Sequence, residues 1–182
     1  SYGIDIQFED VALYELAKRA YEEKTGARGL VSAVEKVLLK FEKRLPSTHI
    51  QKLVVTRAVV ENPEQELEQL LQEPSNSEML AKFDMLLSQE KKTVKESIWN
   101  RESEFKKRYG MVFSEARIDL IAQRVVEKGY DVNTVFEEVV EVQQQLEQFE
   151  RDFQRKNGIL IRFSEEAFDR ITEIALNEDG KG

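Results

Sequence analysis

The chain has 182 residues, with 27 Lys and Arg against 35 Asp and Glu, which gives a formal net charge of -8 at pH 7. The absence of cysteine excludes a disulfide framework and a thiolate metal site. The acidic balance argues against nucleic-acid binding, which needs a clustered basic face. No apolar stretch approaches the ~20 residues of a membrane span, so we expect a cytoplasmic protein with no membrane partner.

The first third of the chain predicts a strand, two amphipathic helices and a second strand. The strand-like segments lie near residues 3–8 and 51–56. Between them, apolar residues recur at helical spacing in two stretches, namely Leu13, Leu16, Ala17 and Ala20 in the first and Leu30, Val34, Val37, Leu38, Phe41 and Leu45 in the second. A glycine-containing turn separates the two predicted helices.

That turn, Gly26-Ala27-Arg28-Gly29, places an arginine at the start of the second predicted helix. A helix start carries the positive end of the macrodipole, so a cation there costs about 0.3–1 kcal/mol unless an anion lies nearby. Free backbone amides at a helix start also bind phosphate. Two interpretations remain open: Arg28 is an incidental surface residue of an ordinary turn, or it contacts an anion such as a nucleotide phosphate.

The stretch from Tyr2 to about Val60 resembles the C-terminal small domain of ClpX-type AAA+ protein unfoldases, ring-shaped ATPases that feed substrates to a partner peptidase. The matching elements, in order, are Gly3-Ile4-Asp5-Ile6-Gln7-Phe8, the helix with Lys18 and Ala20, Lys24-Thr25-Gly26-Ala27-Arg28-Gly29-Leu30, and Leu45-Pro46-Ser47 before Lys52-Leu53-Val54-Val55. The resemblance implies that Arg28 is the "sensor 2" arginine, which reaches the terminal phosphates of ATP, with ATP or ADP as the cofactor of the whole protein. It implies that Gly26, Ala27 and Gly29 belong to the same cofactor-binding turn.

The resemblance also shows what this chain lacks. Phosphate binding in such ATPases needs a Gly-rich loop ending in Gly-Lys-Ser or Gly-Lys-Thr, and none of the eight glycines precedes such a pair. We therefore expect no catalytic residue and no metal site here, with nucleotide and magnesium bound mainly by an upstream domain of a larger protein. The implied partners are that ATPase domain, neighbouring subunits of a hexameric ring, and a peptidase ring with its protein substrates.

The composition changes between Glu61 and Glu78, where six residues are acidic and none is basic. Pro63 and Pro74 bracket a short helical pattern in this segment. We therefore predict a small domain at residues 1–60, an acidic junction at 61–78 and a helical extension at 79–182.

The extension begins with one predicted long helix, from Met79 to about Tyr109, which Gly110 ends. Its later part contains degenerate copies of the first strand-helix unit, because Gly158-Ile159-Leu160-Ile161-Arg162-Phe163 echoes residues 3–8 and Phe113-Ser114-Glu115 matches Phe163-Ser164-Glu165. Aligning Phe113 with Phe8 places Asn133 on Arg28. The copies would therefore have lost the phosphate-binding turn.

A heptad-like spacing runs through the second helix of the copy, at Val135, Val139, Val142, Leu146, Phe149 and Phe153. Two interpretations remain open. The helix packs inside the chain as an antiparallel hairpin with the helix at 79–109, or it presents a surface to a partner. Three heptads or fewer are marginal for an independent coiled coil, which favours the first interpretation.

Together these patterns predict an α+β fold dominated by helices, with short strands near 3–8, 51–56 and 158–163 in one or two small antiparallel sheets. The favoured function is the nucleotide-sensing and ring-packing C-terminal (lid) domain of an ATP-dependent unfoldase or chaperone, which is not catalytic by itself. The alternative is a non-catalytic interaction or dimerisation module built on the same fold.

Overall fold

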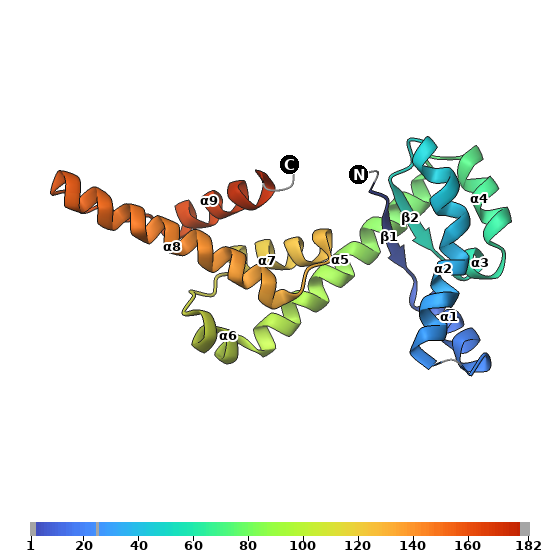
Figure 1. Ribbon diagram of the computed structural model, residues 1–182. Helices are drawn as coiled ribbons and strands as arrows, with labels where there is room; N and C mark the ends of the chain where they lie inside the picture. Colours follow the sequence, from blue (N-terminus) through green and yellow to red (C-terminus); the bar gives the residue numbers. More distant parts are fainter. Residues whose placement is uncertain (1–2, 25, 179–182) are drawn as a thin grey trace. The chain divides into compact units, whose positions relative to one another are not determined.

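The computed structural model describes residues 3–24 and 26–178, and the chain forms two compact units, residues 1–89 and 90–182 (Figure 1). The division falls inside helix α5 (Ser77–Asn100), whereas the sequence places its domain limits after residues 60 and 78. Tyr2 and Thr25, which belong to the stretch used for the family resemblance, lie outside the described residues. Every helix in the described ranges is too short or too polar to span a bilayer.

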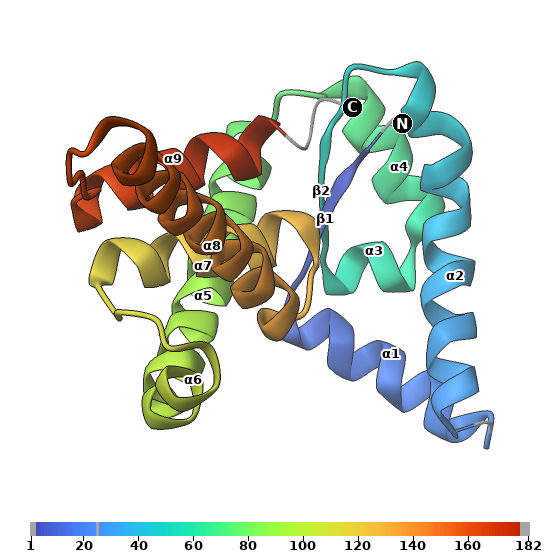
Figure 2. The same ribbon diagram turned by 60° about the vertical axis from the view of Figure 1, so that its left-hand side comes forward.

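The first unit is built around a two-stranded sheet. Strand β1 (Asp5–Phe8) is followed by α1 (Asp10–Glu22), α2 (Gly26–Arg44), the short 3-10 helix η1 (Leu45–Ser47) and strand β2 (Lys52–Val55). The two strands pair in parallel, from Asp5 opposite Lys52 to Phe8 opposite Val55, and Figure 2 shows them side by side. The predicted antiparallel sheet is therefore wrong. A parallel pair needs a long crossover connection, which α1 and α2 supply.

Strand β2 separates two layers of the first unit. Leu53 and Val55 are buried in the core cluster that contains Phe41 of α2. Lys52 points to the other side, where its Nζ lies 3.0 Å from Asp84 Oδ1 of α5 and 4.9 Å from the ring centre of Phe83. Because alternate strand residues face opposite sides of a sheet, α2 and the first half of α5 cover its two faces.

The acidic segment packs against this core. Helices α3 (Arg57–Glu61) and α4 (Pro63–Gln72) follow β2, and Leu67 and Leu70 of α4 are buried in the core of the first unit. The glutamates of α4 meet basic residues of α2, because Lys40 pairs with Glu64 and Arg44 pairs with Glu68. Segment 61–78 therefore folds as part of the first unit, and its charge complements α2.

The second unit contains the end of α5 followed by α6 (Glu102–Tyr109), α7 (Glu115–Lys128), α8 (Val132–Asn157) and α9 (Glu165–Glu178). The single helix predicted for residues 79–109 is wrong, since it breaks at Arg101 between α5 and α6. There the Arg101 N–H donates to Ile98 O at 3.1 Å, and both Ile98 and Phe105 enter the core. Gly110 ends α6 in the left-handed conformation, as predicted.

Residues 158–163 form a loop instead of the predicted third strand. Gly158 ends α8 with φ of 66°, and the Phe163 N–H donates to Glu150 Oε1 at 2.7 Å instead of to a strand. The two copied segments resemble each other in how they start a helix, because Ser114 Oγ accepts from the Arg117 N–H and Ser164 Oγ from the Ala167 N–H. The similarity between the segments at 113–115 and 163–165 thus reflects a loop followed by a capped helix, and neither segment is preceded by a strand.

Helix α8 packs on α6, α7 and α9, and Figures 1 and 2 both show α9 returning alongside it. The first half of its heptad pattern is core, since Val135 and Val139 are fully buried, as is Phe136 next to Val135. Phe136 stacks against Phe105 with a ring-centre distance of 4.5 Å. Helix α8 therefore packs within the chain over its first half.

Candidate functional site

Arg28 lies in the first turn of α2, which begins two residues earlier at Gly26. Gly26 has φ of 58°, a left-handed conformation that glycine adopts without a steric cost. It permits the sharp turn from α1 into α2. The prediction that this arginine opens the second helix is confirmed.

The surroundings of Arg28 leave its guanidinium accessible. The first turn of α2 holds no acidic residue, and Arg28 is exposed. With the residues that the structure describes, Arg28 makes no ion pair, whereas Arg19 of α1 pairs with Glu15 and donates to Val60 O at 3.0 Å. Within the described ranges, no acidic side chain thus compensates the charge of Arg28 at the positive end of α2. This arrangement is the one expected of an arginine that binds an anion.

The four residues of the predicted turn divide into two sets. Gly26, Ala27 and Arg28 are exposed, whereas Gly29 is buried. Gly29 shares the buried face of α2 with Ala33, one turn further along. Gly29 therefore faces the interior of the first unit, and the other three residues are the ones on the surface.

Helices α1 and α2 carry several large exposed apolar side chains. Arg28 shares one face of α2 with Val31 and Leu39, which are 58% and 48% exposed, because these positions are spaced by three and then eight residues. Helix α1 adds further exposed apolar side chains, namely Val11, Leu13, Tyr14 and Tyr21. Exposed apolar side chains mark a contact with another domain or chain where they group into one patch.

The apolar positions whose spacing predicted these two helices are only partly buried. Leu16, Ala20, Val37, Leu38, Phe41 and Leu45 are buried. Leu13 and Leu30 are 45% and 38% exposed, and Ala17 is exposed as well. The apolar stripes of α1 and α2 are wider than the surface that the first unit itself can cover.

The cavity of about 490 Å³ in the first unit does not contain the predicted turn. It lies between β2, α4 and α5, with Phe41, Leu53 and Leu70 among its apolar residues and Glu66 and Glu73 among its polar ones. None of residues 26–29 lines it. This cavity is therefore separate from the predicted nucleotide-binding turn.

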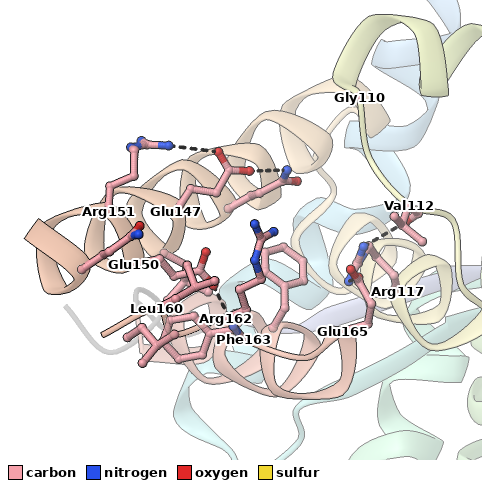
Figure 3. Close-up of a pocket in the computed structure, with 15 residues that line it drawn as sticks. Gly110, Val112, Arg117, Glu147, Glu150, Arg151, Leu160, Arg162, Phe163 and Glu165 are labelled. Carbon is pink, nitrogen blue, oxygen red and sulfur yellow. Dashed lines mark hydrogen bonds and ion pairs between the residues drawn. The ribbon is translucent and has the colours of Figure 1, made fainter. Parts of the chain in front are cut away.

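The second unit contains a polar cavity of about 440 Å³ between α7, α8, the loop at 159–164 and α9 (Figure 3). Arg117, only 2% exposed, lies at one end of it. Its Nε donates to Asp169 Oδ1 at 2.7 Å, its Nη2 to Glu165 Oε2 at 2.7 Å and its Nη1 to Val112 O at 3.0 Å. All three guanidinium nitrogens are satisfied within the unit, so Arg117 holds α9 in place.

A second buried arginine fastens the other end of α9. Arg124 Nη1 donates to Leu176 O at 2.6 Å, and its Nε donates to Glu138 Oε2 of α8 at 2.8 Å. Neither arginine was predicted from the sequence. The available signal was their position, because Arg117 and Arg124 lie four residues before and three residues after the buried Ile121, on the apolar stripe of α7.

Residues 1–52 match the family model for the C-terminal, D2-small domain, of ClpB protein. The match includes the turn at 26–29 and ends inside β2, and it covers 52 of the 182 residues. No solved structure matches the chain. The ClpX-type assignment is therefore corrected: the match supports, for this segment, a C-terminal small domain of an AAA+ unfoldase of the ClpB type.

Proposed function

We propose that the first unit is the nucleotide-sensing and ring-packing domain of an ATP-dependent protein unfoldase or chaperone, and that Arg28 contacts the terminal phosphates of ATP held by an upstream ATPase domain. One observation carries the proposal: an exposed arginine stands at the positive end of α2 with no carboxylate in the same turn. A guanidinium is permanently charged, and its planar set of donors fits phosphate oxygens.

Sensing requires that Arg28 interacts differently with ATP and ADP. A hydrogen bond to a charged group contributes about 1.5–3 kcal/mol, which shifts an equilibrium about tenfold or more. If Arg28 reaches the γ-phosphate, ATP favours the arrangement in which the small domain lies against the nucleotide, and hydrolysis removes that preference. The residues of this chain would thus orient and report on the nucleotide, while magnesium and the catalytic groups belong to the upstream domain.

Ring packing is supported by the exposed apolar side chains of α1 and α2. Tyr14 and Tyr21 of α1 are 73% and 84% exposed, and Val31 of α2 is 58% exposed next to Arg28 on the same face. In a ring, the contact between neighbours joins one surface of a subunit to a different surface of the next subunit. The small domain therefore needs to supply only one of these two surfaces. We assign this surface to the subunit's own ATPase domain or to its neighbour in a hexamer. A peptidase partner rests on the ClpX-type resemblance alone, and the ClpB-type match gives it no support.

The test is the Arg28→Ala substitution in the intact parent protein, with ATP hydrolysis and substrate unfolding as readouts. We expect a loss of about tenfold or more in either rate, because a charge-assisted contact to phosphate is removed. Arg44→Ala is the matched control, since Arg44 is an exposed arginine at the other end of the same helix. Unchanged hydrolysis and unfolding in Arg28→Ala, or an equal loss in Arg44→Ala, would remove the assignment.

A further inference from the structure

The heptad pattern of α8 continues beyond the core of the second unit. Val135 and Val139 are fully buried, and Leu146 is partly buried. Phe149, on the next turn, is 52% exposed although it contacts two aromatic rings, with ring-centre distances of 6.1 Å to both Phe153 and Phe163. These contacts hold the Phe149 ring in one place while half of its surface faces solvent.

Other apolar residues are exposed at the same end of the unit. Ile159 and Leu160, in the loop that follows α8, are 58% and 61% exposed. Large apolar side chains grouped in this way mark an interaction surface more often than single exposed residues do. We call Phe149, Ile159 and Leu160 the α8 end patch.

The charges along α8 indicate what covers this patch. Glu141 lies eight residues before Phe149, and Lys156 lies seven residues after it. At about 1.5 Å per residue, these charges are about 12 Å and 10.5 Å from Phe149 along the helix axis. At about 100° per residue, both lie within about 80° of Phe149 around the axis. Both are exposed, and Lys156 makes no ion pair within the part of the chain that the structure describes.

We propose that two copies of this chain pair through the ends of their α8 helices, antiparallel, about a two-fold axis at Phe149. In that arrangement Glu141 of each copy faces Lys156 of the other, because their distances from the axis differ by only about 1.5 Å. A parallel pair would place Glu141 beside Glu141 and Lys156 beside Lys156, so repulsion disfavours it. The opposite charges of Glu141 and Lys156 thus favour a second copy in the antiparallel orientation, and Asp152 on the same face is paired with Arg155 of its own helix.

This contact differs from the ring contact of the proposed function. A two-fold contact uses the same patch on both partners and closes after two copies, whereas a ring contact joins two different patches. The pairing therefore links subunits two at a time through the second unit. It also does not depend on nucleotide or on Arg28.

The test is sedimentation equilibrium of the full 182-residue chain over a concentration series. The unsubstituted chain should show a reversible monomer–dimer equilibrium, and Phe149→Glu should lower the association constant at least about tenfold. Met85→Glu is the matched control, because Met85 is also 52% exposed but lies in the first unit. Circular dichroism should show the same helicity for all variants.

A second test exchanges the charges of Glu141 and Lys156, and it does not alter the packing around Phe149. Glu141→Lys and Lys156→Glu should each weaken dimerisation, by about threefold to tenfold, because each places like charges opposite one another. The double variant Glu141→Lys/Lys156→Glu should restore it. A chain that is monomeric throughout the series would overturn the proposal, and so would a dimer that Phe149→Glu does not weaken or that the double exchange does not restore.

Discussion

The side chains of Arg117 and Asp169 form a hydrogen-bonded ion pair, Nε to Oδ1 at 2.7 Å, in which the arginine is 2% exposed and the aspartate 18%. The pair joins α7 to α9, and the guanidinium also lies over the ring of Phe168 at 4.3 Å. A buried charge of this kind is tolerated because each of the three guanidinium nitrogens donates a hydrogen bond, two of them to carboxylates. The docking of the first turns of α9 therefore depends on Arg117 of α7, as that of its far end depends on Arg124.

We predict that Arg117→Ala destabilises the second unit by about 3 kcal/mol, because it leaves the carboxylate of Asp169 unpaired in a largely buried place. Urea unfolding followed by the fluorescence of Trp99 measures this directly, since Trp99 is the single tryptophan and belongs to the second unit. Arg170→Ala is the control, because its pair with Glu173 is exposed and is worth less than about 1 kcal/mol. Equal losses in the two variants would contradict the structural role of Arg117.

The second unit should also become less stable in acid through Asp119. Partial burial raises its pKa, but hydrogen bonds from Lys91 and Lys95 outweigh that effect and hold the pKa below its usual value. A lowered pKa in the folded state gives stability that is fully present above the unfolded value of about 4 and is lost as the pH falls through the folded value. Asp119 is 44% exposed, so the contribution is less than about 1 kcal/mol.

Asp119→Asn tests this contribution. At pH 7 the variant should unfold at lower urea than the unsubstituted chain, and the difference should vanish as the pH falls well below about 4. Asp10→Asn is the control, because Asp10 is exposed and lies in the first unit. It should not change the urea midpoint reported by Trp99, either at pH 7 or in acid. A deficit in Asp119→Asn that persists in strong acid would show that charge is not its cause.

The turn before Arg28 should depend on glycine. Gly26→Ala should destabilise the start of α2 by about 1–2 kcal/mol, because φ of 58° brings a Cβ close to the backbone. Hydrogen exchange of the peptides covering α1 and α2 measures the effect. Gly3→Ala should change little, since Gly3 lies outside the left-handed region and a Cβ there meets no atom within 4 Å. Equal protection in both variants would contradict a requirement for glycine at residue 26.

Local patterns predicted the helices and the position of Arg28, because 3.6-residue periodicity and glycine turns are properties of short segments. The parallel pairing of β1 and β2 depends on how distant segments meet, which spacing along the chain does not encode. Leu13 and Leu30 show a further limit. Their periodicity is typical of a buried face, but it does not tell whether the covering surface is part of the same unit.

The wrongly predicted strand and the two unpredicted arginines of the second unit have a similar explanation. Residues 158–163 have the apolar composition of a strand, yet Gly158 ends α8 and the structure provides no partner strand within the described ranges. Arg117 and Arg124 interrupt an apolar stripe, and only the positions of Asp169 and Glu138 in the folded unit show why they are tolerated. Long-range ion pairs of this kind follow from tertiary structure and not from local sequence.

The most direct test of the sensing role of Arg28 is the affinity of the intact parent protein for ATP and for ADP, measured with and without Arg28→Ala. If Arg28 contacts the terminal phosphate, the substitution should weaken ATP binding about tenfold or more and leave ADP binding nearly unchanged. Arg28→Lys should recover part of the difference, because it keeps the charge but loses the planar set of donors. Equal affinities for ATP in the unsubstituted protein and in Arg28→Ala would contradict the account.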